Sequence, residues 1–192
     1  GDLRGDMGNI GRTIAVVGYS RIGRRVVDLL QQLEGVRVLV ADPYANALEV
    51  EAAGATLMPL EQVIPLCDIL TLHAPELPST RHMIGAEQLA ALPDNATIIN
   101  TARGSLIDTQ ALEYACQDGR ITAILDVTDP EPLPAQSVLF DLPNVIMTPH
   151  IAGSLGSETR RMTDMALNEL SRYLDGEPLL AEVLVDDLGL SA

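Results

Sequence analysis

The sequence TIAVVGYSRIG at residues 13–23 joins an apolar run of strand length to a glycine turn and the start of a helix. The apolar run predicts a buried strand, and Gly18 and Gly23 have the spacing of the outer glycines in the pattern G-x-G-x-x-G. In that pattern, backbone N–H groups at the N-terminus of the helix bind a pyrophosphate. Ser20 replaces the middle glycine and adds a side chain where the backbone should approach the phosphates.

Apolar runs of strand length alternate with helix-like stretches along most of the chain. We expect strands at residues 13–17, 36–41, 55–57, 68–72, 96–100, 122–126 and 145–148. Helices are expected between them at residues 21–34, 45–53, 59–66, 86–91 and 108–118. This alternation predicts an α/β protein with a doubly wound parallel sheet of the Rossmann type, of about seven strands. A crossover helix at residues 155–175 and an extended tail would follow.

The charge and length of the chain restrict its partners. Its 192 residues carry a formal net charge of −15, and all 12 basic residues are arginines. The average surface therefore repels nucleic acids and anionic membranes, and we expect neither as a partner. No apolar run approaches the roughly 20 residues of a membrane-spanning helix, so we expect a cytoplasmic protein. Cys67 and Cys116 lack metal-ligand spacing, and we expect inert thiols and no metal site.

Asp42 ends the second expected strand, about 20 positions after Gly23, where dinucleotide-binding proteins place an acid that binds the adenosine ribose. A carboxylate there would repel a 2′-phosphate, so the sequence favours NAD over NADP as the cofactor. The alternative interpretation is a strand-end aspartate that caps the following helix.

Polar residues also follow the later strands, at the sheet edge where doubly wound folds bind ligands. His73, Ala74 and Pro75 follow the fourth strand, with Thr80 a few residues later, and this segment is expected to line the cofactor crevice. His73 itself fits a structural role. His82 lies outside any strand end and is expected to be solvated.

Arg103 follows the fifth strand and precedes Gly104, where the chain turns toward the next helix. Its guanidinium offers a planar fork that matches a carboxylate, which suits the binding of a 2-keto acid against an acidic surface. A surface ion pair is the alternative interpretation of Arg103.

Glu131 and His150 follow the last two strands. Glu131 lies in a proline-rich loop, residues 129–144, that can fold back over the strand ends, and a carboxylate bound to His150 would fix the tautomer of the imidazole. The alternative interpretation of Glu131 is one more acid in an acidic loop, and that of His150 is a structural histidine. Together with Arg103 beside a nicotinamide cofactor, the pair would suit reversible hydride transfer to a 2-keto acid.

With these residues considered, the chain resembles the D-2-hydroxyacid dehydrogenases, which include phosphoglycerate dehydrogenase and glyoxylate/hydroxypyruvate reductases. The resemblance covers about residues 10–178 and adds the motifs Asn100-Thr101-Ala102-Arg103-Gly104, Asp126-Val127, Glu131-Pro132 and Thr148-Pro149-His150-Ile151-Ala152-Gly153. It implies that Arg103 binds the substrate's carboxylate and carbonyl, that His150 is the acid/base and that Glu131 is its partner. It also implies cofactor contacts from Arg21, Ile22, Asp42, Thr101, Ala102, Arg103, Asp126, His150, Ala152 and Gly153.

The resemblance further implies a division of the chain. Members of the family carry an N-terminal segment that builds most of a substrate domain, and their C-terminal end completes it. We therefore expect an NAD-binding Rossmann domain at residues 1–153 and a helix and tail at residues 154–192 that would complete the missing substrate domain. Such a fragment would be weakly active or inactive by itself. The family pattern also implies a homodimer formed through the cofactor domains, with the 129–144 loop near the contact.

Two functions remain open at this point. One is an oxidoreductase that transfers a hydride between NAD(H) and a small 2-hydroxy or 2-keto acid. The other is an NAD-sensing dimeric scaffold, similar to corepressors that resemble this family. Arg103, Glu131 and His150 favour the enzyme, because a scaffold does not need an acid/base pair. An amino-acid dehydrogenase is disfavoured because such sites generally use a lysine, which this chain lacks.

Overall fold

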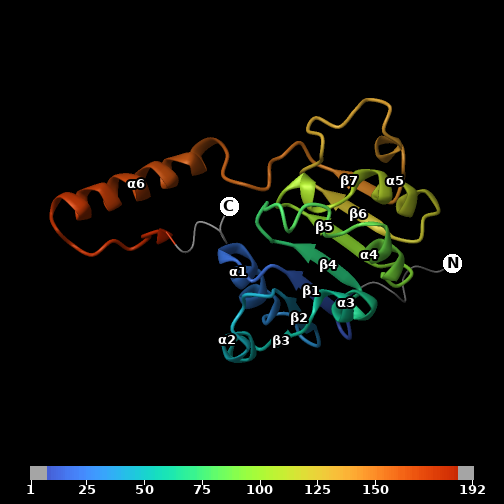
Figure 1. Ribbon diagram of the computed structural model, residues 1–192, viewed down its shortest axis with the longest axis horizontal. Helices are drawn as coiled ribbons and strands as arrows, with labels where there is room; N and C mark the ends of the chain where they lie inside the picture. The colour runs from blue at the N-terminus through green and yellow to red at the C-terminus, as the bar shows by residue number, and fades with distance from the viewer. Residues whose placement is uncertain (1–7, 186–192) are drawn as a thin grey trace.

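A seven-stranded sheet forms the centre of the computed structural model, which describes residues 8–185 (Figure 1). Adjacent strands are parallel, and their order in space is β3-β2-β1-β4-β5-β6-β7. The order reverses between β1 and β4, the topological switch point at which doubly wound folds bind ligands. The predicted fold class is confirmed. The strands are β1 (Thr13–Val17), β2 (Arg37–Ala41), β3 (Thr56–Leu57), β4 (Ile69–Leu72), β5 (Thr97–Asn100), β6 (Thr122–Leu125) and β7 (Val145–Met147).

Helices connect these strands, and two apolar clusters lie on opposite faces of β1. Ala15 and Val17 belong to the larger cluster and Val16 to the smaller one, because successive side chains of a strand point to opposite faces. The α-helices are α1 (Arg21–Leu30), α2 (Ala47–Ala52), α3 (Leu60–Val63), α4 (Ala86–Ala91), α5 (Thr109–Gln117) and α6 (Thr159–Leu174). Short 3-10 helices are η2 (Ile64–Leu66), η3 (Gly104–Leu106), η4 (Val138–Phe140) and η5 (Gly156–Glu158).

When η2 is counted with α3 and η5 with α6, the boundaries of these elements lie within two residues of the predicted ones, with one larger difference. The first helix, α1, ends at Leu30 and not at residue 34. Beyond it, the N–H groups of Gln32 and Leu33 donate to carbonyl groups three residues back, so the chain tightens into turns. Gly35, with a φ of 72°, then follows in a left-handed conformation, and the chain enters β2.

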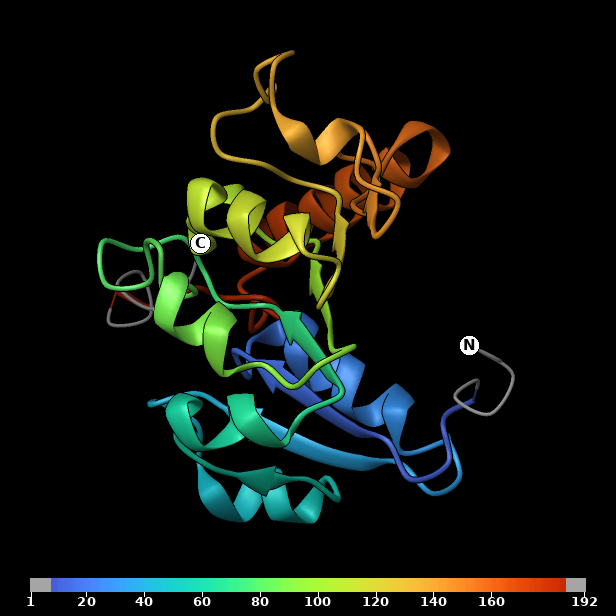
Figure 2. The ribbon, with the colours of Figure 1, turned by 90° about the vertical axis from the view of Figure 1, so that its right-hand side faces the viewer.

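The last helix, α6, stands apart from the sheet (Figure 1), and in the view of Figure 2 it lies behind the strands. Every residue from 151 to 168 is exposed, and Met162, Met165 and Leu170 form an uncovered apolar stripe on α6. Neither α6 nor any other helix within residues 8–185 is long and apolar enough to cross a membrane.

Candidate active site

Three neighbouring strands bring the predicted polar residues to one edge of the sheet. Arg103 follows β5, Asp126 comes directly after β6, and His150 follows β7. The carboxyl ends of adjacent parallel strands lie at the same edge, which is also where β1 turns into α1. The chain therefore places the glycine turn and the polar residues along one rim.

The turn after β1 packs directly on the segment after β4. Gly18 has a φ of 91°, and a Cβ at this position would lie 2.5 Å from the backbone nitrogen of Ala74. Glycine is required here by both the conformation and the close approach. The glycine turn and residues 73–75 are thus in contact, as expected for the two sides of one crevice.

Ser20 is the N-cap of α1. Its hydroxyl accepts a hydrogen bond of 3.2 Å from the N–H of Gly23. The serine therefore supports the first turn of the helix, a role that the sequence comparison with a middle glycine did not reveal. The N–H groups of Arg21 and Ile22 have no acceptor within the helix, so they are available at its end.

Asp42 connects the glycine turn to the segment after β2 by accepting hydrogen bonds from backbone N–H groups. Its Oδ2 accepts a hydrogen bond of 2.7 Å from the N–H of Tyr19, and its Oδ1 accepts one of 2.8 Å from the N–H of Tyr44. The cap of α2 is Asn46, so the interpretation of Asp42 as a helix cap is wrong. Each carboxylate oxygen has a further lone pair, so Asp42 can accept additional hydrogen bonds.

The segment after β4 is held by its own hydrogen bonds. The hydroxyl of Thr80 donates to the carbonyl of Pro75 at 2.7 Å and accepts from the N–H of Leu77 at 2.8 Å. Nε2 of His73 lies 3.0 Å from the hydroxyl of Thr71, and burial lowers the pKa of His73 to about 4. His73 is therefore neutral at pH 7, in agreement with a structural role.

Buried Asn100 shapes the turn that carries Arg103. Its Nδ2 donates to the carbonyl of Arg103 at 2.8 Å, and its Oδ1 accepts from the N–H of Ala102 at 3.1 Å. The exposed guanidinium of Arg103 donates to the carbonyl of Ala102 at 2.7 Å. No carboxylate within residues 8–185 forms an ion pair with Arg103, so the structure does not support the surface ion-pair interpretation.

The turn of Arg103 also touches the loop that carries Glu131. A Cβ on Gly104 would lie 2.0 Å from the carbonyl carbon and oxygen of Thr128. The two backbones are therefore in direct contact, and only glycine permits this approach. The close packing ties the β5 end of the rim to the β6 end.

Asp126 fixes the segment that follows β7. It is buried and accepts hydrogen bonds from the hydroxyl of Thr148 and, at 2.8 Å each, from the N–H groups of Ile151 and Ala152. Burial acts to raise the pKa of Asp126, but these hydrogen bonds and the nearby His150 outweigh it and hold the pKa below its ordinary value. The ionised carboxylate therefore anchors the chain around the imidazole.

The structure joins Glu131 and His150. Nδ1 of His150 lies 2.7 Å from Oε1 of Glu131, and both side chains are about half exposed. His150 has a φ of 54°, and its N–H donates to the carbonyl of Asp126 at 3.0 Å. Because Nδ1 is bound to the carboxylate, Nε2 is the nitrogen available to a ligand.

A groove of about 540 Å³ opens beside this pair. One part of its wall is polar and includes Glu131 and His150, and the rest is formed mainly by apolar side chains of the 129–144 loop and β7. The groove is lined by Asp126, Thr128, Glu131, Pro132, Leu133, Leu139, Phe140, Val145, Met147, Thr148, Pro149 and His150.

His82 is exposed, in agreement with the prediction that it is solvated, and its ring also faces two carboxylates. Its side chain is 42% exposed, with Nδ1 at 3.9 Å from Oδ2 of Asp108 and Nε2 at 3.9 Å from Oδ2 of Asp129. Its backbone N–H donates to the carbonyl of Ser105 at 2.7 Å. The two aspartates come from distant segments, so the sequence around His82 carries no signal for this arrangement.

The comparison with known protein families identifies the chain. Residues 6–152 match the family described as "D-isomer specific 2-hydroxyacid dehydrogenase, NAD binding domain". The chain belongs to this family. The resemblance inferred from the sequence is therefore confirmed.

Individual D-2-hydroxyacid dehydrogenases and related reductases are similar along most of the chain. The D-3-phosphoglycerate dehydrogenase of Methanocaldococcus jannaschii is 39% identical over 180 residues, which make up 92% of this chain and 33% of the relative. The glyoxylate reductase of Korarchaeum cryptofilum is 38% identical over 169 residues, or 87% of this chain and 50% of the relative. The chain thus spans between a third and a half of these relatives.

A solved structure agrees with the fold. D-lactate dehydrogenase with NAD+ from Lactobacillus jensenii superposes with a TM-score of 0.79 at 34% sequence identity. The superposition covers 90% of this chain and 56% of that protein.

The residues at the switch point fit NAD, the cofactor of this domain family. The free N–H groups of the first turn of α1 suit a pyrophosphate, and Ile22 offers an exposed apolar side chain beside them. The remaining lone pairs of Asp42 suit the two hydroxyls of an adenosine ribose. Gly18 keeps the turn close to the sheet and leaves no side chain over the crevice.

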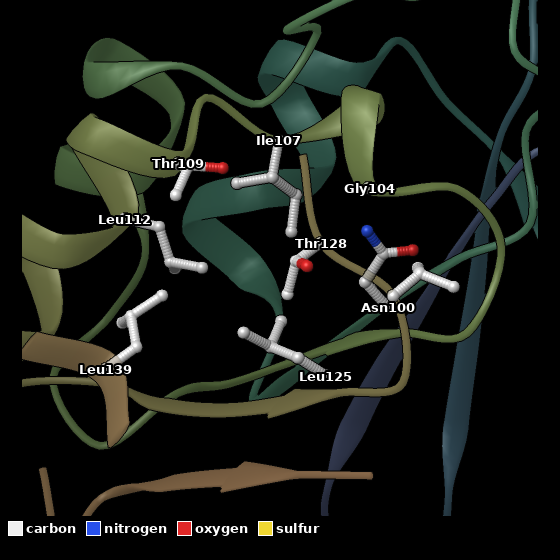
Figure 3. Close-up of a pocket in the computed structure, with 9 residues that line it drawn as sticks. Asn100, Gly104, Ile107, Thr109, Leu112, Leu125, Thr128 and Leu139 are labelled. Carbon is white, nitrogen blue, oxygen red and sulfur yellow. The ribbon is translucent and has the colours of Figure 1, made fainter. Parts of the chain in front are cut away.

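A small cavity behind the Arg103 turn is not a second ligand site (Figure 3). Its volume is about 10 Å³, which is room for one water molecule at most. The cavity lies where α5, β6 and the turn after β5 meet, and it is lined by Asn100, Gly104, Ile107, Thr109, Leu112, Leu125, Val127, Thr128 and Leu139.

No metal site and no reactive thiol are found in the part of the chain that the structure describes. Within residues 8–185, no three His, Cys, Asp or Glu side chains are grouped to hold a metal ion. Cys67 and Cys116 are buried, and burial raises the pKa of both thiols to about 11. Both are therefore protonated and poor nucleophiles at pH 7.

Proposed function

We propose that this chain is the cofactor domain of an oxidoreductase that transfers a hydride between NAD(H) and a small 2-hydroxy or 2-keto acid. The observation that carries the proposal is the 2.7 Å contact between Glu131 and His150 at the rim of an NAD-binding domain. Bound NADH would supply the hydride for the keto carbon. The side chains of the rim would bind the acid and move the proton.

Proton transfer is assigned to His150. With Nδ1 hydrogen-bonded to Glu131, the imidazole presents Nε2 to the substrate. In the reductive direction, Nε2 donates a proton to the carbonyl oxygen, and in the oxidative direction it accepts the proton of the hydroxyl. Glu131 holds the ring in this orientation and stabilises the imidazolium form.

Substrate binding is assigned to Arg103. Its exposed guanidinium lies at the end of β5, next to the strand whose following loop carries Glu131. Two parallel N–H donors match the oxygens of a carboxylate, and the positive charge polarises the neighbouring carbonyl. In a chain with a net charge of −15, such a local cation is needed to attract an anionic acid.

The cofactor is assigned as NAD in preference to NADP because of Asp42. A 2′-phosphate would meet this carboxylate, which already accepts two backbone hydrogen bonds and keeps its negative charge at the crevice. Asp126 accepts three hydrogen bonds from its own chain and shapes the rim, and its expected contact with the cofactor stays a prediction. Cofactor contacts from the other rim residues remain predictions, namely His73, Ala74, Pro75, Thr80, Thr101, Ala102, His150, Ala152 and Gly153.

Residues 1–153 are assigned to the NAD-binding domain and residues 154–192 to a substrate domain. The chain is hydrogen-bonded to Asp126, directly after β6, up to Ala152, whereas α6 beyond it has no buried residue. The apolar stripe of α6 therefore suits packing against a further part of the intact enzyme. Residues 186–192 of the expected tail lie outside the described part.

A homodimer through the cofactor domain is the assembly that the exposed apolar surface supports. On one face of the sheet, Ile99 and Ile124 are half-buried, and Ile146 of the edge strand β7 is 54% exposed. Phe140, in the 129–144 loop, is also exposed. Light scattering of the intact protein tests this assembly, and a monomer would contradict it. A cytoplasmic location remains a prediction.

The function is tested with the intact protein and a panel of 2-keto acids. Each acid is mixed with NADH, and oxidation of the cofactor is followed by the loss of its dihydronicotinamide absorbance. Turnover of at least one acid supports the enzyme. If NAD binds tightly and no acid is reduced, the scaffold function is favoured instead.

A further inference from the structure

Arg81 forms an ion pair with the loop that carries Glu131. Its Nη2 lies 3.0 Å from Oδ2 of Asp129, two residues before Glu131. We propose that Arg81 is a positioning residue that acts through Asp129 to place Glu131 and thereby fixes the tautomer of His150. This inference rests on the proposed acid/base role of that pair.

Residue 129 is held at both its side chain and its backbone. The hydroxyl of Thr109, at the start of α5, donates to the carbonyl of Asp129 at 2.6 Å. The carboxylate of Asp129 contacts Arg81 at 3.0 Å and faces Nε2 of His82 at 3.9 Å. Three residues from two segments of the chain thus converge on one residue of the loop.

Glu131 depends on this anchor because it has little support of its own. Within residues 8–185, its one polar side-chain contact is with His150. The backbone on its other side is fixed by Leu133, which is buried against the larger core. A half-exposed carboxylate between two anchored neighbours takes its position from them, so a shift of Asp129 would be passed to the 2.7 Å contact with His150.

The backbone of Arg81 is itself held firmly. Its N–H donates to the carbonyl of Leu77 at 3.1 Å, and the next residue, His82, donates to Ser105 at 2.7 Å. Ser105 belongs to η3, directly after the Arg103 turn. The ion pair therefore connects the loop of Glu131 to the same framework that carries Arg103.

Because the ion pair between Arg81 and Asp129 is partly exposed, its effect on the position of Glu131 can be distinguished from an effect on the stability of the fold. The side chains of Arg81 and Asp129 are 55% and 31% exposed, and ion pairs at such sites contribute little to the free energy of unfolding. We therefore expect removal of the charge to leave the melting temperature nearly unchanged. The effect should appear at the imidazole of His150.

The test uses this chain and the ¹⁵N chemical shifts of its histidine rings at neutral pH. With three histidines in the sequence, single substitutions assign each signal. In the unmodified chain, the shifts should show His150 with its proton on Nδ1. Arg81→Gln should move both ring nitrogens toward the averaged values of a tautomer mixture, and Arg81→Lys should restore them. Asp129→Asn should reproduce the effect of Arg81→Gln by a second route.

Two further variants make the outcome decisive. Arg24→Gln removes a comparable ion pair, 2.9 Å from Glu49 and 52% exposed on both sides, and should leave His150 unchanged. Glu131→Gln removes the direct partner and should shift the ring most. If Glu131→Gln shifts the ring while Arg81→Gln and Asp129→Asn do not, the positioning role is wrong and the acid/base pair stands. If Glu131→Gln has no effect either, the pair itself is wrong and the positioning role fails with it.

In the intact enzyme, Arg81→Gln should reduce turnover and leave substrate binding nearly unchanged. Arg81→Gln is expected to lower kcat several-fold with little change in KM for the keto acid, and Arg81→Lys should recover most of the loss. An unchanged kcat for Arg81→Gln, in a protein whose His150→Gln variant is impaired, would overturn the positioning role.

Discussion

Nδ1 of His150 lies 2.7 Å from Oε1 of Glu131, although the two residues follow different strands and are both about half exposed. Their contact is formed by the backbone around them. Asp126 binds Thr148 before the histidine and Ile151 and Ala152 after it, and residue 129 anchors the loop of the glutamate. The pair is therefore accessible to solvent and substrate, while hydrogen bonds of the neighbouring residues fix its geometry.

His150→Gln should lower kcat of the intact enzyme by about 10²- to 10⁴-fold, the range for loss of a general acid or base. Glutamine keeps a polar side chain of similar reach but cannot exchange a proton near neutral pH. Steady-state assays with NADH and the best keto acid measure the effect, and NAD binding confirms that the fold is intact. Glu61→Gln, at an exposed position of α3, is the surface control. Unchanged turnover would remove His150 from the mechanism.

Arg103→Ala should mainly raise KM for the keto acid. Loss of hydrogen bonds to a carboxylate removes about 1.5–3 kcal/mol, or roughly 10- to 100-fold in affinity. The KM for NADH should change much less, because it reports another part of the rim. Arg25→Ala, on the exposed side of α1, provides a matched loss of charge. An equal KM for the acid in Arg103→Ala and in the unmodified enzyme would exclude the carboxylate clamp.

Asp42→Asn should weaken NAD binding and reduce the preference of the chain for NAD over NADP. The amide keeps one oxygen acceptor but loses the negative charge that repels a 2′-phosphate. We expect the ratio of the two dissociation constants to change by about tenfold, equivalent to about 1.4 kcal/mol. Calorimetric titration of this chain with each cofactor measures it, with exposed Asp28→Asn on α1 as the control. A ratio that does not move would show that Asp42 does not face the ribose.

Gly104→Ala should destabilise the chain by about 1–3 kcal/mol, the cost of an overpacked contact. The added Cβ would lie 2.0 Å from the backbone of Thr128, which cannot yield as a flexible side chain could. Gly153→Ala is the matched control, because a Cβ there meets nothing within 4 Å. Its unfolding free energy should stay within about 0.5 kcal/mol of the unmodified chain. Urea unfolding compares the two, and equal stability would disprove the close packing of the two loops.

The stability of the chain should fall as the pH is lowered from about 6.5 to about 4 because of His73. Burial lowers the pKa of His73 from 6.5 to about 4 in the folded chain. The unfolded chain therefore binds more protons in this window, and the free energy of unfolding rises with pH. Urea unfolding at pH 7 and pH 5 measures this, and His73→Gln should lose less stability on acidification. Parallel losses in both proteins would show that His73 does not titrate with unfolding.

The order of strands and helices could be predicted because each element carries its own pattern. The apolar runs of β1, β2 and β4 differ clearly from the helical stretches between them, and parallel strands follow from that alternation. The strand-end positions of Arg103 and His150 could be predicted for the same reason. The end of α1 differed because the chain tightens into turns before Gly35, and the predicted helices at residues 59–66 and 155–175 each include a 3-10 segment.

Several contacts around the site could not be predicted, because they join residues that are distant in the sequence and leave no pattern in either segment. Asn46 caps α2 where Asp42 was the candidate, since capping depends on the turn geometry between them. His82 and Arg81 meet Asp129 across a separation of more than forty residues. The φ of 54° at His150 likewise follows from the anchoring by Asp126 and cannot be predicted from residue types alone.

The hydrogen bonds from Ile151 and Ala152 to Asp126 also determine where the molecule can bend. The backbone is clamped as far as Ala152, and the next residues lead through an uncovered stretch to α6. Any swing of α6 must pivot beyond Ala152. The imidazole of residue 150 would then travel with the strands and keep its distance from the glutamate throughout such a motion.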